Sequence, residues 1–514
     1  MQTKKTVIDA GRAATALAQK GSLPIIELFQ TGQNLVDAGE RPLGIALYRA
    51  WLAHTQSPLA YAVQFNLAVM LSDNGELSEA EAAYRMALAQ NPRFNEGHLN
   101  LGTLLERQRR PDEALASWRT LLENSNPQPP PYHPRVIQAL NNLGRLLELQ
   151  KDFPGAEDAL TRSLLIDPKQ KNVISHWVHL RQKQCKWPVY NTSICGIPVE
   201  DLMTGTSALA MLSASGDPAQ QLAASRRYVE EKVNASVKPL TGPQGYGHER
   251  LRIGYLSSDF CSHAVSILTA ELYELHDRSK FDIYAFSWSR EDGSPIRARV
   301  VKAMDHYLRI DHLSDEQAAR TIRAHEIDIL IDLHGLTLGA RPNILAYRPA
   351  PVQLTYLGFP GSTGLPGIDY VLADEFLITP EMTRDFSEQP LYLPDTFQIN
   401  DRQRLIAPKP TRASVNLPED AFVFCSFNNN FKFTPEVFAV WMNILNRVPG
   451  SVLWLVADYP EVRENLWRYA EQAGVARTRL IFNSRAMPAD YLARYQLADL
   501  FLDTYPFNAG TTAS

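Results

Sequence analysis

A spacing of 34 positions recurs in the first third of the chain, and it constrains the fold more than any other feature of the sequence. Ala46, Ala80 and Ala114 are separated by 34 positions, as are Pro58 and Pro92. A period of this length, with small residues at fixed places, is typical of stacked pairs of amphipathic helices. One pair cannot bury its apolar face alone, so we expect at least three pairs to form an array.

The individual units resemble tetratricopeptide repeats. One unit supplies small and large apolar residues at the expected places: Leu67, Ala68, Leu71, Ala80, Tyr84, Ala87 and Pro92. Two further units place Gly102 and Gly144 where two helices must approach closely. The last unit is displaced by 42 positions, and the extra residues fall in the Pro-rich stretch 126–134, which we expect to be a surface loop. We therefore predict a helical cap and degenerate repeat over 1–58 and tetratricopeptide repeats over 59–170.

Three asparagines recur at equivalent positions of the first helix of each unit: Asn66, Asn100 and Asn142. Amide side chains both donate and accept hydrogen bonds, so a row of them suits the backbone of an extended peptide. The alternative is a solvated polar row without a ligand. A repeat array by itself would make the chain a binding module.

Composition excludes several other classes. The chain has 51 Lys and Arg against 56 Asp and Glu, so a strongly basic nucleic-acid-binding protein with a pI above about 9 is not expected. Its four cysteines form no CxxC pair, which favours a reducing, cytoplasmic compartment over a zinc or disulfide framework. We find neither a signal peptide nor an apolar run of ~18 residues, and therefore predict no membrane partner.

Strands and helices alternate in the last half of the chain. A helical linker is predicted over 171–248, with helices over 177–190 and 217–237. Strands are then predicted at 251–260, 281–288, 328–335, 352–361 and 369–375, with helices at 296–305 and 314–325 between them. After residue 413 the alternation restarts, with strands at 421–428, 451–458, 479–484 and 499–504 and helices at 435–448, 460–474 and 488–498. This pattern predicts two α/β lobes, at 249–412 and 413–514, each with a parallel sheet between helices.

Glycine-rich or polar loops follow five of these strands, at 257–263, 334–339, 358–364, 428–432 and 505–512. Glycines permit close approach of a ligand to the backbone, and the carboxyl ends of parallel strands are where ligands bind. Gly510-Thr511-Thr512 offers free amides to a phosphate, and Lys432 offers a positive charge. A single loop of this kind is more often an ordinary turn, but five at corresponding strand ends indicate a ligand site. The chain has no GxxxxGK[ST] motif and no GxGxxG after a strand, which disfavours a nucleoside triphosphatase or a nicotinamide enzyme.

Several of these loops are similar to those of a known family. The segments LRIGYLSSDFCSHAVS, RPAPVQLTYLGFPGSTGLPGIDY, FNNNFKFTPEVFAVWMNILNRVPGSVLWL and DLFLDTYPFNAGTTAS resemble the O-linked N-acetylglucosamine transferase and SPINDLY family. The resemblance covers roughly residues 60–514. It implies a tetratricopeptide superhelix followed by a GT-B glycosyltransferase of two Rossmann-like lobes. It also implies transfer of a sugar from a nucleotide-sugar to Ser or Thr hydroxyls of proteins, with inversion and without a metal, on acceptors recruited by the repeats.

The resemblance also implies roles for individual residues. His263 matches a histidine that faces sugar and acceptor and has been considered as a base, and Lys432 matches a lysine on the donor diphosphate. Positions implied to bind the nucleotide-sugar are Asn429, Gly510, Thr511, Thr512, Thr337, Gly358 and Pro360. For His263 a structural or donor-positioning role is the alternative, and Asp259 is a second candidate base that better suits orienting the loop.

One departure from the family pattern leaves the donor open. O-linked N-acetylglucosamine transferases commonly carry a histidine before the paired threonines, where this chain has Gly510. That difference leans toward SPINDLY, so GDP-fucose is an alternative to UDP-N-acetylglucosamine as donor. A catalytically silent peptide-binding scaffold is a second alternative. Because the chain stops in the phosphate-binding loop, the resemblance further implies that the second lobe is truncated and that the parent protein is longer.

Overall fold

A computed structural model describes residues 4–125, 134–242 and 244–514, so most of the predicted loop at 126–134 lies outside the described residues. The chain forms two compact units, one of Met1–Val173 with Ser193–Gly196 and one of Ile174–Thr192 with Ile197–Ser514. Each unit is described by itself below.

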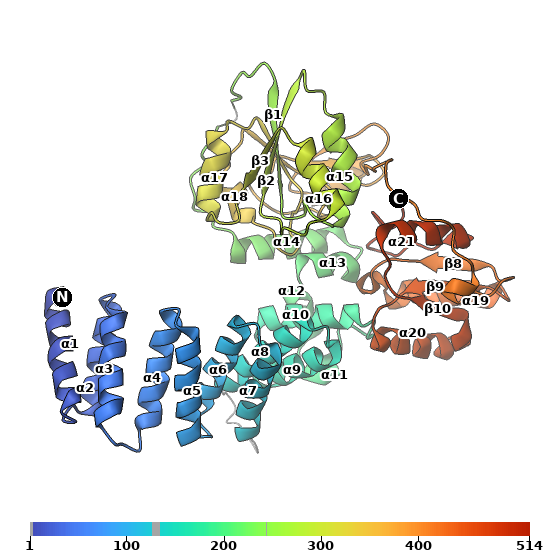
Figure 1. The fold of residues 1–514 in the computed structure, drawn as a ribbon. Coiled ribbons are helices and arrows are strands. Elements are labelled where there is room, and N and C mark those ends of the chain that lie inside the picture. The colour runs from blue at the N-terminus through green and yellow to red at the C-terminus, as the bar shows by residue number, and fades with distance from the viewer. Residues whose placement is uncertain (1–3, 126–133, 243) are drawn as a thin grey trace. The chain divides into compact units, whose positions relative to one another are not determined.

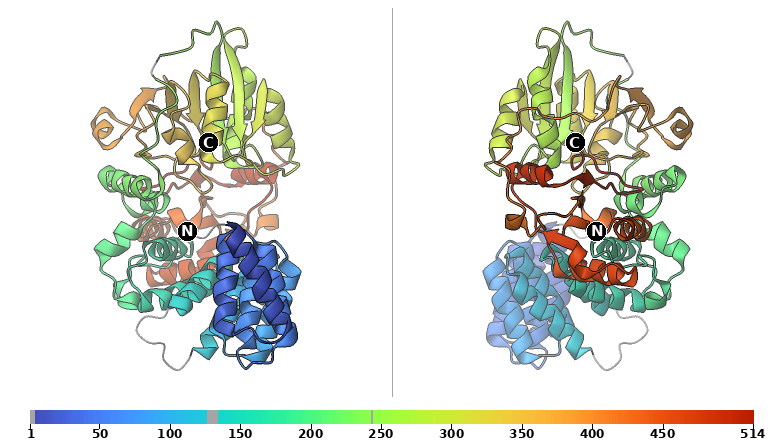
Figure 2. Two further views of the ribbon diagram at one scale, coloured as in Figure 1. Left: turned by 90° about the vertical axis from the view of Figure 1, so that its left-hand side faces the viewer. Right: turned by 90° about the vertical axis from the view of Figure 1, so that its right-hand side faces the viewer.

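The first unit is an array of antiparallel helix pairs. Its helices are α1 (Lys4–Gln19), α2 (Ile25–Asp37), α3 (Arg41–His54), α4 (Ala60–Asp73), α5 (Leu77–Gln90), α6 (Asn95–Arg107), α7 (Pro111–Asn124), α8 (Pro134–Leu149) and α9 (Phe153–Ile166). Each helix packs against the next, as the blue helices of Figures 1 and 2 show. The predicted repeats are confirmed, and 25–58 forms the pair α2 and α3, against which α1 packs.

Glycines set the spacing inside these pairs, as the repeat pattern predicts. A Cβ added to Gly102 on α6 would lie 2.3 Å from Nε1 of Trp118 on α7. That indole is fully buried, and its Nε1 donates a hydrogen bond to the Leu99 carbonyl at 3.1 Å. A Cβ on Gly144 would likewise lie 2.3 Å from Leu160. Close packing of this kind leaves no room for even one methyl group.

Substitution of Gly102 by alanine is therefore expected to destabilise the repeat array. The added methyl must displace a buried indole whose hydrogen bond fixes its position, which costs about 1–3 kcal/mol of unfolding free energy in spite of the better helix propensity of alanine. Urea denaturation followed by circular dichroism measures the effect. Gly245→Ala is the control, because its Cβ would meet nothing within 4 Å, and its effect is expected within about 0.5 kcal/mol. Equal stability of the two variants would contradict this account of the repeats.

Five helices separate the repeats from the sheets: α10 (Lys171–Lys183), α11 (Thr192–Cys195), α12 (Val199–Gly205), α13 (Ala208–Ala214) and α14 (Pro218–Lys232). The predicted helix over 177–190 ends early, at Lys183, because Cys185 adopts a positive φ of 50° and turns the chain. The residues that follow pack on the second lobe instead. There the amide of Trp187 donates to the Tyr469 hydroxyl, and Asn465 donates to the Gln184 carbonyl, both at 2.9 Å.

The first sheet has seven parallel strands in the order β3-β2-β1-β4-β5-β6-β7. Their bounds are β1 (Leu251–Ser257), β2 (Phe281–Ser287), β3 (His306–Arg309), β4 (Ile329–Asp332), β5 (Val352–Thr355), β6 (Tyr370–Ala373) and β7 (Gln389–Tyr392). The helices α15 (Ala264–Leu275), α16 (Pro295–Ala303), α17 (Asp315–Ala324) and α18 (Pro342–Ala346) connect them. Sequence analysis did not predict the helices α15 and α18. Among the strands it missed β3 and β7, which form the two edges of the sheet. An edge strand is short and partly solvated, so its sequence lacks the apolar run of a central strand.

The second sheet has four parallel strands in the order β10-β9-β8-β11. They are β8 (Val423–Ser426), β9 (Val452–Val456), β10 (Leu480–Asn483) and β11 (Leu500–Phe501), with the helices α19 (Pro435–Arg447), α20 (Pro460–Gln472) and α21 (Pro488–Arg494). Alternate residues of β8 and β9 enter separate cores on the two faces: Phe424 and Leu453 one, Cys425 and Trp454 the other. Both predicted lobes are therefore parallel α/β layers. Among the described residues, none of the helices combines the length and hydropathy needed to cross a bilayer.

Candidate functional site

The loops that sequence analysis selected in the first lobe gather at one edge of the sheet. Strand β4 lies between β1 and β5, and Asp332 at its carboxyl end pairs in register with Leu256 on one side and Thr355 on the other. The loops that follow these three strands begin side by side. They carry His263, Thr337, Gly358 and Pro360 in turn, so the structure brings the predicted residues of this lobe together.

His263 forms the N-cap of α15, and its side chain is half-exposed. Its Nδ1 lies 3.4 Å from Asp259 Oδ2 and 3.3 Å from the amide nitrogen of Val265. The two neighbours favour different protonation states: the carboxylate favours a proton on Nδ1, whereas the amide needs a lone pair there. With the proton on Nδ1, the Nε2 lone pair is free for a substrate hydroxyl.

Asp332 is a functional candidate that sequence analysis did not single out. Its carboxylate is buried and accepts the amides of His334 at 3.2 Å and Gly335 at 2.7 Å. Burial raises the pKa of Asp332 to about 7, although those two hydrogen bonds act to lower it. The two hydrogen bonds from the amides of His334 and Gly335 fix the start of the 334–339 loop to the Asp332 side chain.

The glycine of the third loop has a packing role that the sequence did not reveal. A Cβ on Gly358 would lie 1.9 Å from the Leu333 carbonyl oxygen, so only glycine permits the loops after β4 and β5 to approach this closely. Pro360, two residues further on, is exposed.

A buried carboxylate fixes the rest of that loop. Glu388 is 2% exposed. One oxygen accepts the Thr363 amide at 2.8 Å and its hydroxyl, and the other accepts the hydroxyls of Ser362 at 2.6 Å and Ser387 at 3.0 Å. Hydrogen bonds to a charged acceptor are stronger than neutral ones, so this cluster pins the Gly-rich loop to the β7 end of the sheet.

Lys432, the cation predicted for the second lobe, is partly desolvated. Lys432 ends the short 3-10 helix η3 (Asn430–Lys432) directly after β8. Its Nζ donates to the Asn508 carbonyl at 2.8 Å and lies 3.7 Å from the centroid of the Phe507 ring. Burial lowers the pKa of Lys432 to about 8, and the negative charge of Asp503 opposes that shift.

The neighbours of Lys432 include one residue that sequence analysis missed. Asn429 is exposed, whereas Asn428 is 1% exposed and its Oδ1 has no hydrogen-bond partner within the described part of the chain. Its Nδ2 lies 3.4 Å from Asp503 Oδ1. A buried acceptor without a donor is costly, so Asn428 is the more strongly constrained of the two asparagines. Only its place at the strand end pointed to it in the sequence.

Asp503 organises the last predicted loop. Its carboxylate accepts the amides of Thr504 at 2.7 Å and Ala509 at 2.8 Å, together with Asn508 Nδ2 at 3.2 Å. In the residues described for this loop, the amides of 510–512 donate to no backbone or side-chain acceptor. Three free amides in a tight turn suit an anion, and they follow the same loop whose Asn508 carbonyl holds Lys432.

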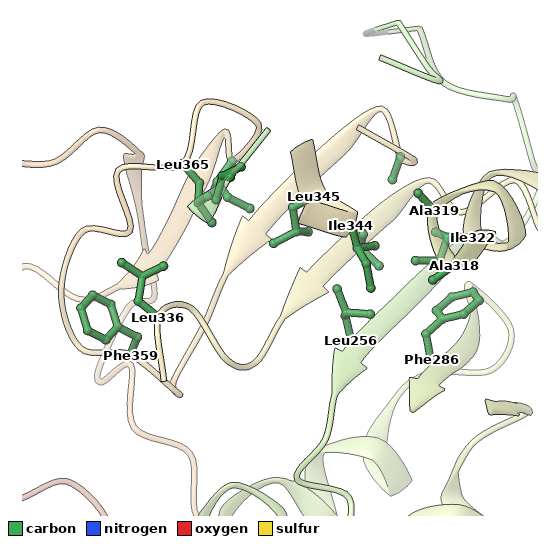
Figure 3. Packing of buried hydrophobic residues seen from close by; sticks show 14 of the residues in the cluster. Leu256, Phe286, Ala318, Ala319, Ile322, Leu336, Ile344, Leu345, Phe359 and Leu365 are labelled. Atoms are coloured by element: carbon green, nitrogen blue, oxygen red, sulfur yellow. The ribbon is translucent and has the colours of Figure 1, made fainter. Parts of the chain in front are cut away.

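Phe507 connects this loop with the first lobe. Its ring underlies the Lys432 ammonium and packs against the apolar cluster that contains Leu336 and Phe359. Figure 3 shows those two side chains next to one another. Phe507 therefore packs against the apolar core that contains residues of the first lobe.

The predicted asparagine row lies on α4, α6 and α8, the first helices of three successive pairs, and all three side chains are partly exposed. Asn100 contacts the Tyr84 hydroxyl through a side-chain hydrogen bond. A peptide-binding role for Asn66, Asn100 and Asn142 remains a prediction.

Two parallel α/β lobes, with helical repeats ahead of both in the sequence, define a repeat-headed protein of GT-B fold. The chain belongs to glycosyl transferase family 41, whose model matches residues 231–410 and 409–514. Tetratricopeptide models match residues 29–93 and 94–169.

Similar proteins agree with this assignment. The chain is 38% identical over 315 residues to the Arabidopsis thaliana protein named "Probable UDP-N-acetylglucosamine--peptide N-acetylglucosaminyltransferase SEC", a match over 58% of this chain and 32% of that protein. It is 34% identical over 279 residues to Arabidopsis SPINDLY, covering 51% and 29%. The chain thus spans about a third of the length of these relatives. A solved mutant of the Thermobaculum terrenum O-GlcNAc transferase superposes with a TM-score of 0.56 and 25% identity, covering 88% of this chain and 80% of that one.

Removal of the Glu388 carboxylate is expected to destabilise the first lobe. Glu388→Ala leaves an amide and three hydroxyls without their acceptor in a buried place, at a cost of about 2–5 kcal/mol in unfolding free energy. Glu388→Gln is the matched control, because it keeps the shape and one acceptor, and should lose only about 1–2 kcal/mol. Chemical denaturation measures both, and equal losses would contradict the role given to the charge.

Proposed function

We propose that this chain transfers a sugar from a nucleotide-sugar to Ser or Thr hydroxyls of proteins, with inversion at the anomeric carbon. The observation that carries the proposal is the place of Lys432 beside three free amides, at the strand ends of a lobe that the family 41 model matches. An ammonium and backbone amides together suit a diphosphate.

The proposed displacement requires stabilisation of the leaving group. The acceptor oxygen forms a bond to the anomeric carbon as the bond from that carbon to the diphosphate oxygen breaks, and negative charge develops on the departing nucleoside diphosphate. Lys432 and the amides of 510–512 neutralise this charge in place, so they contribute most where the charge is largest. The residues present can do so without a metal.

The acceptor hydroxyl must also lose its proton. We assign this to Nε2 of His263. Its lone pair is free when Nδ1 carries a proton toward Asp259, 3.4 Å away, and gives up the bond from the Val265 amide. A donor-positioning role for His263 is the alternative, with the proton leaving through water or phosphate.

UDP-N-acetylglucosamine is the first candidate donor, supported by the names of the two relatives from Arabidopsis thaliana. GDP-fucose is the second candidate, favoured by Gly510 in the place of a histidine. Protein acceptors are proposed to reach the site through the repeats, where Asn66, Asn100 and Asn142 offer amides to an extended backbone. The third candidate, a silent scaffold, rests on the repeats alone.

Affinity for UDP is expected to fall as the pH rises through the pKa of Lys432. The ammonium is the form that binds the diphosphate, and burial places its pKa at about 8, so the protonated fraction and the affinity both fall about tenfold between pH 7 and 9. Isothermal titration calorimetry over this range measures the change. Lys432→Arg is the matched control, because a guanidinium keeps its proton and should flatten the profile. A profile that is flat for the wild-type chain would contradict the assignment.

Turnover tests the reaction itself. Release of UDP or GDP is measured with UDP-N-acetylglucosamine and GDP-fucose, using peptide and cell-lysate protein acceptors. Lys432→Ala is expected to lower turnover ~100-fold or more, by comparison with the loss of one oxyanion donor in other enzymes. Lys302→Ala, an exposed lysine on α16, is the control and should leave turnover unchanged. Binding of UDP without release from any donor would favour the silent scaffold and overturn the transferase proposal.

A further inference from the structure

His334 joins the loops that follow β1 and β4, although nothing in the proposed reaction uses it. Its side chain is 1% exposed. Nε2 accepts a hydrogen bond from the Ser258 amide at 2.9 Å, and Nδ1 lies 2.9 Å from the Thr337 hydroxyl oxygen. One ring therefore holds two loops, one with the predicted sugar-pocket residue Thr337 and one that leads to His263.

These partners determine which ring nitrogen carries the proton. A backbone amide only donates, so Nε2 must present its lone pair to Ser258 and the proton must reside on Nδ1. Nδ1 then donates to the Thr337 hydroxyl, which in turn donates to the His334 carbonyl at 3.0 Å. Every donor in this chain of bonds has an acceptor, and no second ring proton can be added without breaking the bond from Ser258.

The same bonds extend toward His263. The Ser258 hydroxyl lies 2.9 Å from His334 Nε2 and donates to Asp259 Oδ1 at 3.3 Å. The other carboxylate oxygen, Asp259 Oδ2, lies 3.4 Å from His263 Nδ1. His334 thus acts on the position of the Asp259–His263 pair through Ser258.

The surroundings keep the imidazole neutral. The Trp288 ring stacks on it at 5.2 Å between centroids and is fixed by a hydrogen bond from its Nε1 to the Gly339 carbonyl at 2.9 Å. Burial lowers the pKa of His334. The negative charge of Asp259, 3.6 Å from Nε2, acts to raise this pKa, and the positive charge of a protonated His263 acts to lower it further. The Arg341 guanidinium lies 5.7 Å from the centroid of the Trp288 ring and adds no negative charge to these surroundings.

We propose that His334 is a positioning residue, a neutral imidazole protonated at Nδ1 that places Thr337 for the donor sugar through one nitrogen and the Asp259–His263 pair for the acceptor through the other. The proposal deepens the transferase function and rests on it for its kinetic consequences. The protonation state itself does not depend on turnover.

Two substitutions separate the two arms of the proposal, which are the bond from Nδ1 to Thr337 and the bond from the Ser258 amide to Nε2. In His334→Asn the side-chain amide nitrogen takes the place of Nδ1, so the bond to Thr337 is kept and the acceptor for the Ser258 amide is lost. We expect kcat to fall about tenfold with a shifted pH profile, and the KM of the donor to stay within about twofold. In His334→Gln the side-chain oxygen takes the place of Nε2 and the Thr337 bond is lost, so the donor KM should rise about tenfold with the pH profile unchanged.

Equal losses in kcat and KM for both variants, in step with a lower melting temperature, would show a merely structural role and overturn the proposal. His334→Ala, which removes both arms, should show both kinetic effects at once.

Nitrogen chemical shifts of the chain labelled with 15N-histidine test the protonation state without any turnover. The two His334 resonances are assigned by their absence from His334→Gln, and the exposed His312 serves as the reference. We expect a protonated Nδ1 and an unprotonated Nε2 that persist between about pH 5.5 and 8.5. A proton on Nε2, or titration in this range, would overturn the proposal. If no donor supports turnover but the shifts are as expected, the transferase proposal fails and the neutral His334 stands.

Discussion

The pairing of β4 between β1 and β5 is the constraint on which the candidate site of the first lobe depends. Parallel neighbours end at the same edge of a sheet, so the register Leu256–Asp332–Thr355 places three loop origins side by side. Close approach then requires two further conditions. Gly358 must lack a side chain, because its Cβ would meet the Leu333 carbonyl at 1.9 Å, and a buried carboxylate must hold the amides that begin the next loop.

Burial acts in opposite ways on the two kinds of ionisable group near these strand ends. At Lys432 it lowers the pKa to about 8, so much of the ammonium is still charged at neutral pH, and the carbonyl of Asn508 and the ring of Phe507 solvate it in the absence of an anion. An anion that displaces the carbonyl replaces a neutral partner with a charged one. At Asp332 burial raises the pKa to about 7, and the backbone amides of the next loop supply the compensation. Both groups are held by backbone, which places them rigidly.

The sequence predicted the architecture well where a pattern has a physical period. The 34-residue repeat predicted the helix pairs. Continuous apolar runs predicted nine of the strands, because central parallel strands are buried on both faces. The edge strands β3 and β7 were missed because His-Tyr-Leu-Arg and Gln-Pro-Leu-Tyr have no such run. The helix predicted over 177–190 stops early, since the positive φ of Cys185 has no signature in its residue type.

The position of the candidate site at the strand ends could be predicted from the sequence, but the contacts that hold its loops could not. Strand-end position and the family resemblance selected Lys432, His263 and the 510–512 turn, which all lie at strand ends. They did not select Glu388, whose three hydroxyl partners come from two segments 25 residues apart, or Asn428, whose constraint is an unsatisfied oxygen. Such residues are defined by contacts between loops, and a linear sequence carries no record of those contacts.

In the proposed reaction, the two lobes divide the electrostatic requirements of the displacement between them. The second lobe offers fixed positive charge and free amides, which suit a leaving group that gains negative charge. At the ends of β1 and β4 the first lobe offers a chain of hydrogen bonds that runs from the His334 side chain through Ser258 to the Asp259–His263 pair. The buried Asp332 beside this chain is held by the amides of His334 and Gly335. A charged side chain in the place of His334 would change the electrostatic environment of His263, the proposed base, because interactions between charges are strong where water is excluded. The neutral His334 that we propose would orient Thr337 and the Asp259–His263 pair without that penalty, which a charged residue in its place would incur.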